Sequence, residues 1–274
     1  MLAEELGLDL QLRASLASEV ARSVGREASA FRDASDTASL GISNKGLQDF
    51  VTIADKHAEE TIRSSILARF PEDGFMGEET GGTAGGSGFW VVDPIDGTTN
   101  FIRGFRHWGV SIAYVAAGKV RIGVVYDAAL DKVYSATRAG GALKDGKPIR
   151  ASDVSDPTRA IAILGHSRRT SFEDYQAVAR RLYGMGVDYR RMGAAAIGLV
   201  RVADGIADLY YERHLNGWDM LAGALIAREA GAIVHLPPLE IALGDGGPVI
   251  AYAAGLHKEF DFLREQAVDL YGES

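Results

Sequence analysis

The chain has 274 residues, of which 47% are hydrophobic and 24% are charged, with a formal net charge of −8 and no cysteine. At about 150 residues per domain, this length suits one large globular domain or two closely packed ones. The lack of cysteine excludes disulfides, a thiolate zinc site, an iron–sulfur cluster and a cysteine nucleophile. The acidic balance argues against a nucleic-acid or anionic-membrane partner.

No targeting or membrane segment is visible in the sequence. The N-terminus carries acids and an arginine where a signal peptide needs a basic start and an unbroken apolar run. No stretch reaches the roughly 18 uncharged apolar residues of a membrane span. We therefore expect a cytoplasmic protein that makes no membrane contact.

Two amphipathic helices, separated by a polar loop, are predicted at the start of the chain. In the first, at about residues 8–31, apolar residues recur every four positions and should form a buried stripe: Leu12, Leu16, Val20 and Val24. Arg13 should then face water. The Gly- and Ser-rich segment 32–49 predicts a long mobile loop. A second helix is expected at 55–70, with inner-face residues Ala58, Ile62 and Ile66, and Pro71 ends it.

The middle and the end of the chain show different patterns. Short runs rich in Val, Ile and aromatic residues at about 84–146 predict antiparallel hairpins, and the Gly-rich stretch 81–88 reads as a flexible hairpin connection. Beyond Asp156, strands alternate with helices, which favours α/β layering. The strands are expected at 160–164, 207–212, 232–236 and 248–253, and the helices at 171–185, 195–203, 218–230 and 257–271. This change, from hairpins to alternating strands and helices, predicts two domains, residues 1–155 and 156–274.

The strongest chemical signal is the segment 90–101, Trp-Val-Val-Asp-Pro-Ile-Asp-Gly-Thr-Thr-Asn-Phe. An apolar strand carries Asp93 at its C-terminal end. Pro94 lacks an N–H and restricts the residue before it, so the chain should turn there. Asp96 follows three residues later, close enough for both carboxylates and an intervening carbonyl to bind one cation.

The next residues of this segment suit an anion. Gly97 has no side chain to keep a ligand from its backbone, and Thr98 can begin a helix whose free N–H groups attract negative charge. Two carboxylates beside such a turn suit magnesium-assisted phosphoryl chemistry. The alternative is that these residues only form a turn and cap a helix.

Three further acidic segments have ordinary structural interpretations. Glu78 and Glu79 stand on a predicted loop, where paired acids usually form a solvated turn. Asp55 and Asp219 each stand near the start of a predicted helix, where capping is the default role. Spacing alone cannot bring these segments together. If they converge, five carboxylates in one cleft repel strongly unless cations neutralise them.

These four segments, in this order, resemble the inositol monophosphatase family of magnesium-dependent, lithium-sensitive phosphatases. The matching stretches are 49–55, 77–79, 90–101 and 218–231, which are spread over nearly the whole chain. The resemblance implies a layered α/β fold, a five-layer α-β-α-β-α sandwich. It also implies a homodimer.

The resemblance further implies a metal centre of two or three magnesium ions, with Mn²⁺ as a substitute. Glu78, Asp93 and the backbone carbonyl of Ile95 would hold the first ion. Asp93, Asp96 and Asp219 would hold the second, with Asp93 bridging the two. The first ion would carry the nucleophilic water, and the second would stabilise the leaving oxygen.

The remaining roles come from the same resemblance. Thr98, paired with Asp55, would orient the water and accept its proton, with Glu78 completing the catalytic set. The phosphate would lie on the N–H groups of Gly97 and Thr98, and water would attack in line without a covalent phospho-enzyme. The loop with Lys45 and Asp49 resembles a mobile flap near a weakly held third ion.

The predicted substrate pocket departs from the family's usual pattern. Glu212 matches an acid that accepts hydrogen bonds from sugar or inositol hydroxyls, and its alternative reading is a surface residue at a strand end. Relatives usually carry Gly-Thr-Ala or Gly-Ser-Ala where this chain has Gly193, Ala194 and Ala195, and Asn216 precedes the 217–218 Gly-Trp pair. Loss of a hydroxyl contact costs about 1 kcal/mol, enough to alter the preference among polyols.

We therefore expect a magnesium-dependent phosphomonoesterase acting on inositol 1-phosphate or a similar small polyol phosphate. One alternative is the same chemistry on histidinol phosphate, fructose 1,6-bisphosphate, NADP or a 3′-phosphonucleotide. A second alternative is a regulatory binding protein that keeps the fold. The intact metal ligands argue against a pure binding protein.

Overall fold

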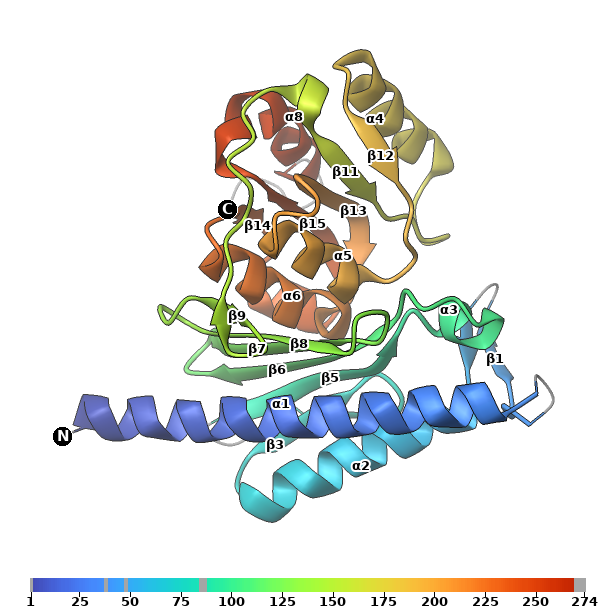
Figure 1. Cartoon of the computed structure of the whole chain (residues 1–274), viewed down its shortest axis with the longest axis vertical. Coiled ribbons are helices and arrows are strands. Elements are labelled where there is room, and N and C mark those ends of the chain that lie inside the picture. Colours follow the sequence, from blue (N-terminus) through green and yellow to red (C-terminus); the bar gives the residue numbers. More distant parts are fainter. Residues whose placement is uncertain (1, 37–38, 47–48, 84–87, 269–274) are drawn as a thin grey trace.

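Two β-sheets and three layers of helices alternate through the molecule (Figure 1). The computed structural model describes residues 2–36, 39–46, 49–83 and 88–268. The larger sheet has the strand order β10-β9-β8-β7-β6-β5-β3-β4 and the smaller β12-β11-β13-β15-β14.

In the larger sheet, β5 to β10 are neighbours in chain order and β3 and β4 are added beside β5, and α1 and α2 cover its outer face (Figure 1). Its strands are β3 (Gly74–Gly77), β4 (Gly81–Thr83), β5 (Gly88–Asp96), β6 (Gly109–Ala116), β7 (Lys119–Asp127), β8 (Lys132–Thr137), β9 (Ala142–Lys144) and β10 (Lys147–Pro148). The two covering helices are α1 (Leu2–Ala34) and α2 (Ile53–Arg69). A two-stranded ribbon of β1 (Ser43–Gly46) and β2 (Asp49–Val51) precedes α2, and the short α3 (Thr98–Arg103) follows β5.

The smaller sheet has helices on both faces. Its strands are β11 (Ile161–Leu164), β12 (Asp188–Arg190), β13 (Leu209–Leu215), β14 (Ile233–His235) and β15 (Gly247–Tyr252). Helices α5 (Ala195–Ala203) and α6 (Gly217–Glu229) lie between the two sheets, and α4 (Phe172–Gly184) and α8 (His257–Val268) cover the outer face (Figure 1). Short helices α7 (Leu239–Leu243), η1 (Pro157–Arg159) and η2 (Ala254–Leu256) complete the chain.

Side-chain alternation explains why both sheets are buried on both faces. In β5, Trp90 packs with α1 and α2, whereas its neighbour Val91 packs with α5 and α6. In β13, Tyr210 faces the central helices and Tyr211 faces α4 and α8. The five-layer α-β-α-β-α sandwich predicted from the sequence is therefore confirmed.

The first helix differs from the prediction in its buried face. Leu12 is 46% exposed, and the buried stripe consists of small residues as well as valines: Ala17, Val20, Ala21, Val24 and Ala28. Arg13, expected to face water, is only 8% exposed. Its guanidinium donates to Asp73 at 2.9 and 3.0 Å and lies 4.0 Å from the ring centroid of Phe70, so a distant carboxylate and an aromatic ring stabilise it in the interior.

The predicted loop at 32–49 contains part of the β1–β2 ribbon, in which Ser43 pairs with Val51. Residues 37–38 and 47–48 lie outside the described chain, so the predicted mobility stays a prediction. The flap role of Lys45 and Asp49 rests on side chains that are also outside it.

The chain does not leave the sheet at Pro94. Strand β5 continues to Asp96, but between the pairs Asp93–Ser111 and Asp96–Gly109 two residues of β5 oppose a single residue of β6. Pro94 therefore sits in a β-bulge, where a missing N–H is tolerated and where the strand redirects its side chains.

The Gly-rich stretch at 81–88 is not the hairpin connection that we predicted. Its first residues form β4, which pairs antiparallel with β3, so the hairpin turn lies at 78–80, and β3 then pairs parallel with β5. Residues 84–87 lie outside the described chain. The antiparallel series from β5 to β10 is confirmed.

The predicted boundary near residue 155 stays a prediction, although residues 74–148 form the larger sheet and 161–252 the smaller. Within the described part of the chain, no helix combines the length and the apolar run needed to cross a bilayer.

Candidate active site

Two of the predicted site acids lie in the first turns of helices. Asp55 is the third residue of α2, and its Oδ2 accepts the backbone N–H of the N-cap residue Thr52 at 2.8 Å. Asp219 holds the same position in α6, and its Oδ2 accepts the N–H of Asn216 at 2.7 Å. Each acid thus completes a capping box, so the capping role we expected from the sequence is present.

Asp96 caps a third helix that is distant in sequence. Its two carboxylate oxygens accept the N–H groups of Ala195 at 2.8 Å and Ile197 at 3.2 Å, in the first turn of α5. The N-cap residue of α5 is Ala194, which has no side-chain oxygen. Asp96 therefore supplies the acceptor that a Ser or Thr at Ala194 would normally supply. The N-termini of α2, α5 and α6 each carry one predicted site acid.

The bulge in β5 connects Asp93 to the other acids. The N–H of Ile95 donates to Asp93 Oδ1 at 3.0 Å. The hydroxyl of Thr98 lies 3.1 Å from both Asp55 Oδ1 and the carbonyl oxygen of Ile95. The structure thus places Thr98 against Asp55, as the resemblance implied, and puts the carbonyl of Ile95 beside them.

Glu78 lies in the turn after β3, and its N–H donates to Val92 at 3.0 Å. Glu59, which is only 1% exposed, fixes the rest of this turn by accepting the N–H groups of Glu79 at 2.8 Å and Thr80 at 2.9 Å. A Cβ on Gly77 would lie 2.2 Å from the carboxyl carbon of Glu59, so only glycine fits. The sequence analysis did not identify Glu59. It could have been noticed because it follows Asp55 by one helical turn and therefore lies on the same face of α2.

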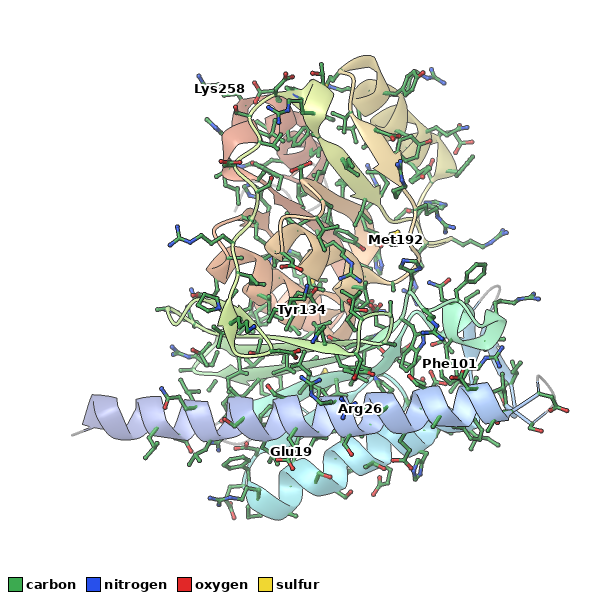
Figure 2. The ribbon with its side chains drawn as sticks, in the orientation of Figure 1. Glu19, Arg26, Phe101, Tyr134, Met192 and Lys258 are labelled. Atoms are coloured by element: carbon green, nitrogen blue, oxygen red, sulfur yellow. The ribbon has the colours of Figure 1, made fainter. Side chains whose placement is uncertain are left out.

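Gly97 is in a left-handed conformation with φ +93°, and a Cβ there would lie 3.0 Å from Cβ of Ala194. Asn100 of α3 donates to the carbonyl oxygens of His107 at 2.6 Å and Met192 at 2.8 Å. Met192 is labelled in Figure 2 and lies just before α5. These contacts bring Gly193, Ala194 and the start of α5 against the Gly97 turn, although the two segments are far apart in the sequence.

Glu212 is buried, with 8% exposure, so its reading as a surface residue is wrong. It accepts the hydroxyl of Tyr210 at 2.7 Å. A Cβ on Gly165 would lie 1.9 Å from Glu212 Oε2, so any other residue at that position would displace the Glu212 carboxyl. Burial raises the pKa of Glu212 to about 8.

Electrostatics tie the acids into one cluster. Burial raises the pKa of Asp93 well above its usual range, and the charges of Glu78, Asp96, Asp219 and Asp55 raise it further. Burial likewise raises the pKa values of Asp96 and Asp219 to about 7, against the lowering effect of the helix N–H groups. The positive charge of Arg169 acts in the opposite direction on Asp219, whose pKa it lowers. The five acids therefore lie close enough to repel one another.

The chemistry of this donor set fits magnesium, although the side chains do not form a closed metal site. Carboxylate and carbonyl oxygens are the ligands that Mg²⁺ prefers, and a divalent cation would offset the repulsion among the acids. Among the described residues, however, no three acidic or histidine side chains are arranged to hold a metal ion as they stand. An ion shared by Asp93, Asp96 and Asp219 therefore requires these side chains to draw closer together than they lie here.

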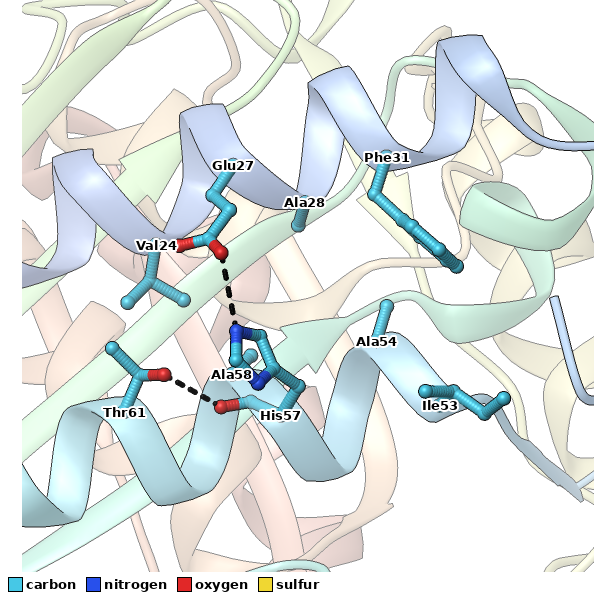
Figure 3. Close-up of a pocket in the computed structure, with 9 residues that line it drawn as sticks. All are labelled: Val24, Glu27, Ala28, Phe31, Ile53, Ala54, His57, Ala58 and Thr61. Carbon is cyan, nitrogen blue, oxygen red and sulfur yellow. Dashed lines mark hydrogen bonds and ion pairs between the residues drawn. The ribbon is translucent and has the colours of Figure 1, made fainter.

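A cavity of about 220 Å³ lies elsewhere, between α1 and α2 (Figure 3). Its walls are mostly apolar, and at its rim His57 Nε2 lies 3.1 Å from Glu27 Oε1. It contains none of the predicted site residues, although Ala54, beside Asp55 on α2, lines it.

The chain is a five-layer α-β-α-β-α sandwich with capping acids gathered at a strand bulge, and comparisons place it in a class of phosphatases. The chain belongs to the inositol monophosphatase family, whose sequence profile matches residues 9–264. The resemblance seen in the sequence is therefore confirmed.

Individual relatives agree with this assignment, and some are named as phosphatases and others as Nus factors. The inositol-1-monophosphatase of Rhizobium meliloti is 38% identical over 204 residues, 73% of this chain and 77% of that protein. The Nus factor SuhB of Escherichia coli K12 is 39% identical over 196 residues, 70% of this chain and 73% of that protein.

Solved structures show the same fold. The extragenic suppressor protein suhB of Bartonella henselae superposes with a TM-score of 0.84 at 30% identity, covering 91% of this chain and 96% of that one. The inositol monophosphatase of Anabaena superposes with a TM-score of 0.80 at 28% identity, covering 94% and 97%.

Proposed function

We propose that this protein is a magnesium-dependent phosphomonoesterase that hydrolyses inositol 1-phosphate or a similar small polyol phosphate. One observation carries the proposal: acids from four distant segments meet at one place, and their mutual repulsion calls for cations. Membership of the inositol monophosphatase family supports phosphatase chemistry. The predicted homodimer and the predicted cytoplasmic location belong to the same proposal.

Two magnesium ions would be held by the acid cluster, the first by Glu78, Asp93 and the carbonyl of Ile95, the second by Asp93, Asp96 and Asp219. When bound, they supply an activated water and a counter-charge for the phosphate and the leaving oxygen.

The other groups of the chain orient the reactants and move one proton. The Thr98 hydroxyl takes a proton from the attacking water and relays its own to Asp55, whose pKa burial has raised. The N–H groups of Gly97 and Thr98 orient the phosphate. Glu212 bonds a hydroxyl of the alcohol while Tyr210 fixes its carboxyl.

A phosphate-release assay with magnesium tests this proposal. Inositol 1-phosphate, histidinol phosphate, fructose 1,6-bisphosphate, NADP and a 3′-phosphonucleotide form the panel. We expect Asp93→Asn and Asp219→Asn to lose nearly all activity. Asp153→Asn, a change at an exposed residue, is the matched control and should retain full activity. Full activity in either site variant would refute the metal assignment.

The relatives named Nus factor SuhB favour a second candidate, a regulatory binding protein that keeps this fold. It predicts no phosphate release from any ester of the panel. A tenfold preference for one ester would instead settle the substrate.

A further inference from the structure

A set of cationic and aromatic side chains lies beside the proposed alcohol pocket. Strands β12, β11 and β13 run parallel, so their carboxyl ends meet at one edge of the smaller sheet, where open α/β sheets bind ligands. The loops leaving this edge are residues 165–171 after β11 and 191–194 after β12. Glu212 lies on β13, one residue beyond the last pair that β13 forms with β11. Gly165 packs directly against Glu212, which places the first loop at the pocket.

Two arginines at this edge lack an acidic partner. Arg190 pairs with Asp188 at 2.8 Å, so its charge is balanced. Arg168 and Arg191 are exposed, and neither forms an ion pair within the described chain. Arg191 uses one nitrogen to donate to the carbonyl oxygen of His166 at 3.0 Å.

Both guanidinium groups lie close to the pocket. Together with burial, Arg191 and Arg168 lower the pKa of His166, and Arg191 also lowers the pKa of Glu212. Arg168 follows His166 by two residues, and the hydrogen bond from Arg191 to the His166 carbonyl brings the loop after β12 to the loop after β11. The hydroxyl of Ser167, which precedes Arg168, is buried and has no hydrogen-bond partner among the described residues.

Aromatic rings support this loop. The ring of His166 lies 5.5 Å from that of Phe172 and 5.3 Å from that of Tyr175, measured between centroids. Phe172 and Tyr175 stack at 5.7 Å with an interplanar angle of 15°. The rings pack against His166, whose carbonyl Arg191 binds, so Arg191 loses less conformational freedom when it binds a ligand.

We propose that Arg168 and Arg191 bind a second anionic group, a phosphate or a carboxylate, on the alcohol part of the substrate. This inference rests on the proposed function, in which the scissile phosphate lies at the Gly97 turn and Glu212 contacts the alcohol. An anion on the alcohol would meet strong repulsion from the acid cluster. The two unpaired guanidiniums offset it, and their forked donors match phosphate and carboxylate oxygens.

Matched pairs of esters test the assignment. Comparing kcat/KM for inositol 1-phosphate and inositol 1,4-bisphosphate measures the effect of a second phosphate on the alcohol. Comparing glycerol 3-phosphate and 3-phosphoglycerate measures the effect of a carboxylate. We expect the wild-type protein, with magnesium, to show a higher kcat/KM for the doubly anionic member of at least one pair. Arg168→Gln and Arg191→Gln should each reduce that preference about tenfold, because each removes a charged hydrogen bond.

The control is Arg180→Gln, an exposed arginine farther along α4, which should leave the preference unchanged. Repeating the comparison at about 0.5 M salt removes long-range steering, and the preference should persist. Equal loss of kcat/KM for both members of each pair, or no preference in the wild-type protein, overturns the proposal. Release of phosphate from no ester at all overturns the proposed function itself, and this inference with it.

Discussion

Replacement of Glu59 by glutamine tests whether the buried Glu59 carboxylate stabilises the turn that carries Glu78. The two N–H donors of this turn bond the Glu59 carboxylate at 2.8 and 2.9 Å in the interior. A glutamine keeps one acceptor but sets its NH₂ against the other donor. Loss of one charged hydrogen bond and burial of an unpaired donor cost about 2–3 kcal/mol.

At about 2–4 °C per kcal/mol, this cost lowers Tm by roughly 5–10 °C. The displaced turn also moves Glu78, so the magnesium concentration for half-maximal activity should rise, and kcat should fall about tenfold or more. Thermal unfolding in EDTA and a magnesium titration of phosphate release measure the two effects. Glu60→Gln, the exposed neighbour on α2, is the control. An unchanged magnesium requirement in a folded Glu59→Gln protein would refute the reasoning.

Three further outcomes follow from the described contacts. Burial raises the pKa of Asp96 in the folded protein to about 7, so the free energy of unfolding of the metal-free protein should fall as the pH rises from about 4 to 7. In Asp96→Asn this dependence of the unfolding free energy on pH should be weaker, as measured by urea unfolding at a series of pH values. Gly165→Ala should raise KM by displacing Glu212, with kcat less affected in steady-state assays. Asp73→Asn removes the carboxylate that accepts two guanidinium hydrogen bonds from Arg13 and leaves Asp9 as its other acidic partner. The free energy of unfolding should fall by about 1–3 kcal/mol, measured by urea titration, and an unchanged value contradicts the role of the pair.

Sequence reasoning succeeded where local pattern and fold agree. Helix α5 was predicted at its observed residues because its apolar run is buried on all sides between two sheets. The segment from Asp93 to Thr98 was singled out as a candidate site because its acids, glycine and threonine are adjacent in sequence, and its role stays a proposal.

Failures arose where a distant partner decides the environment. Arg13 is buried because Asp73, sixty residues away, neutralises it. Glu59 was not predicted because its partners are backbone N–H groups of another segment, and every residue type except proline carries such a group. The bulge at Pro94 was read as a turn because the pairing of β5 with β6 is a tertiary property.

The helix-capping acids have a consequence for how this chain responds to mutation and to selection. Asp55, Asp96 and Asp219 each satisfy backbone donors that would otherwise be unpaired, so the same carboxylates serve the architecture and the proposed chemistry. Removing any one of them weakens the scaffold as well as turnover. A descendant that abandoned hydrolysis for a purely regulatory task would still have a folding reason to retain all three.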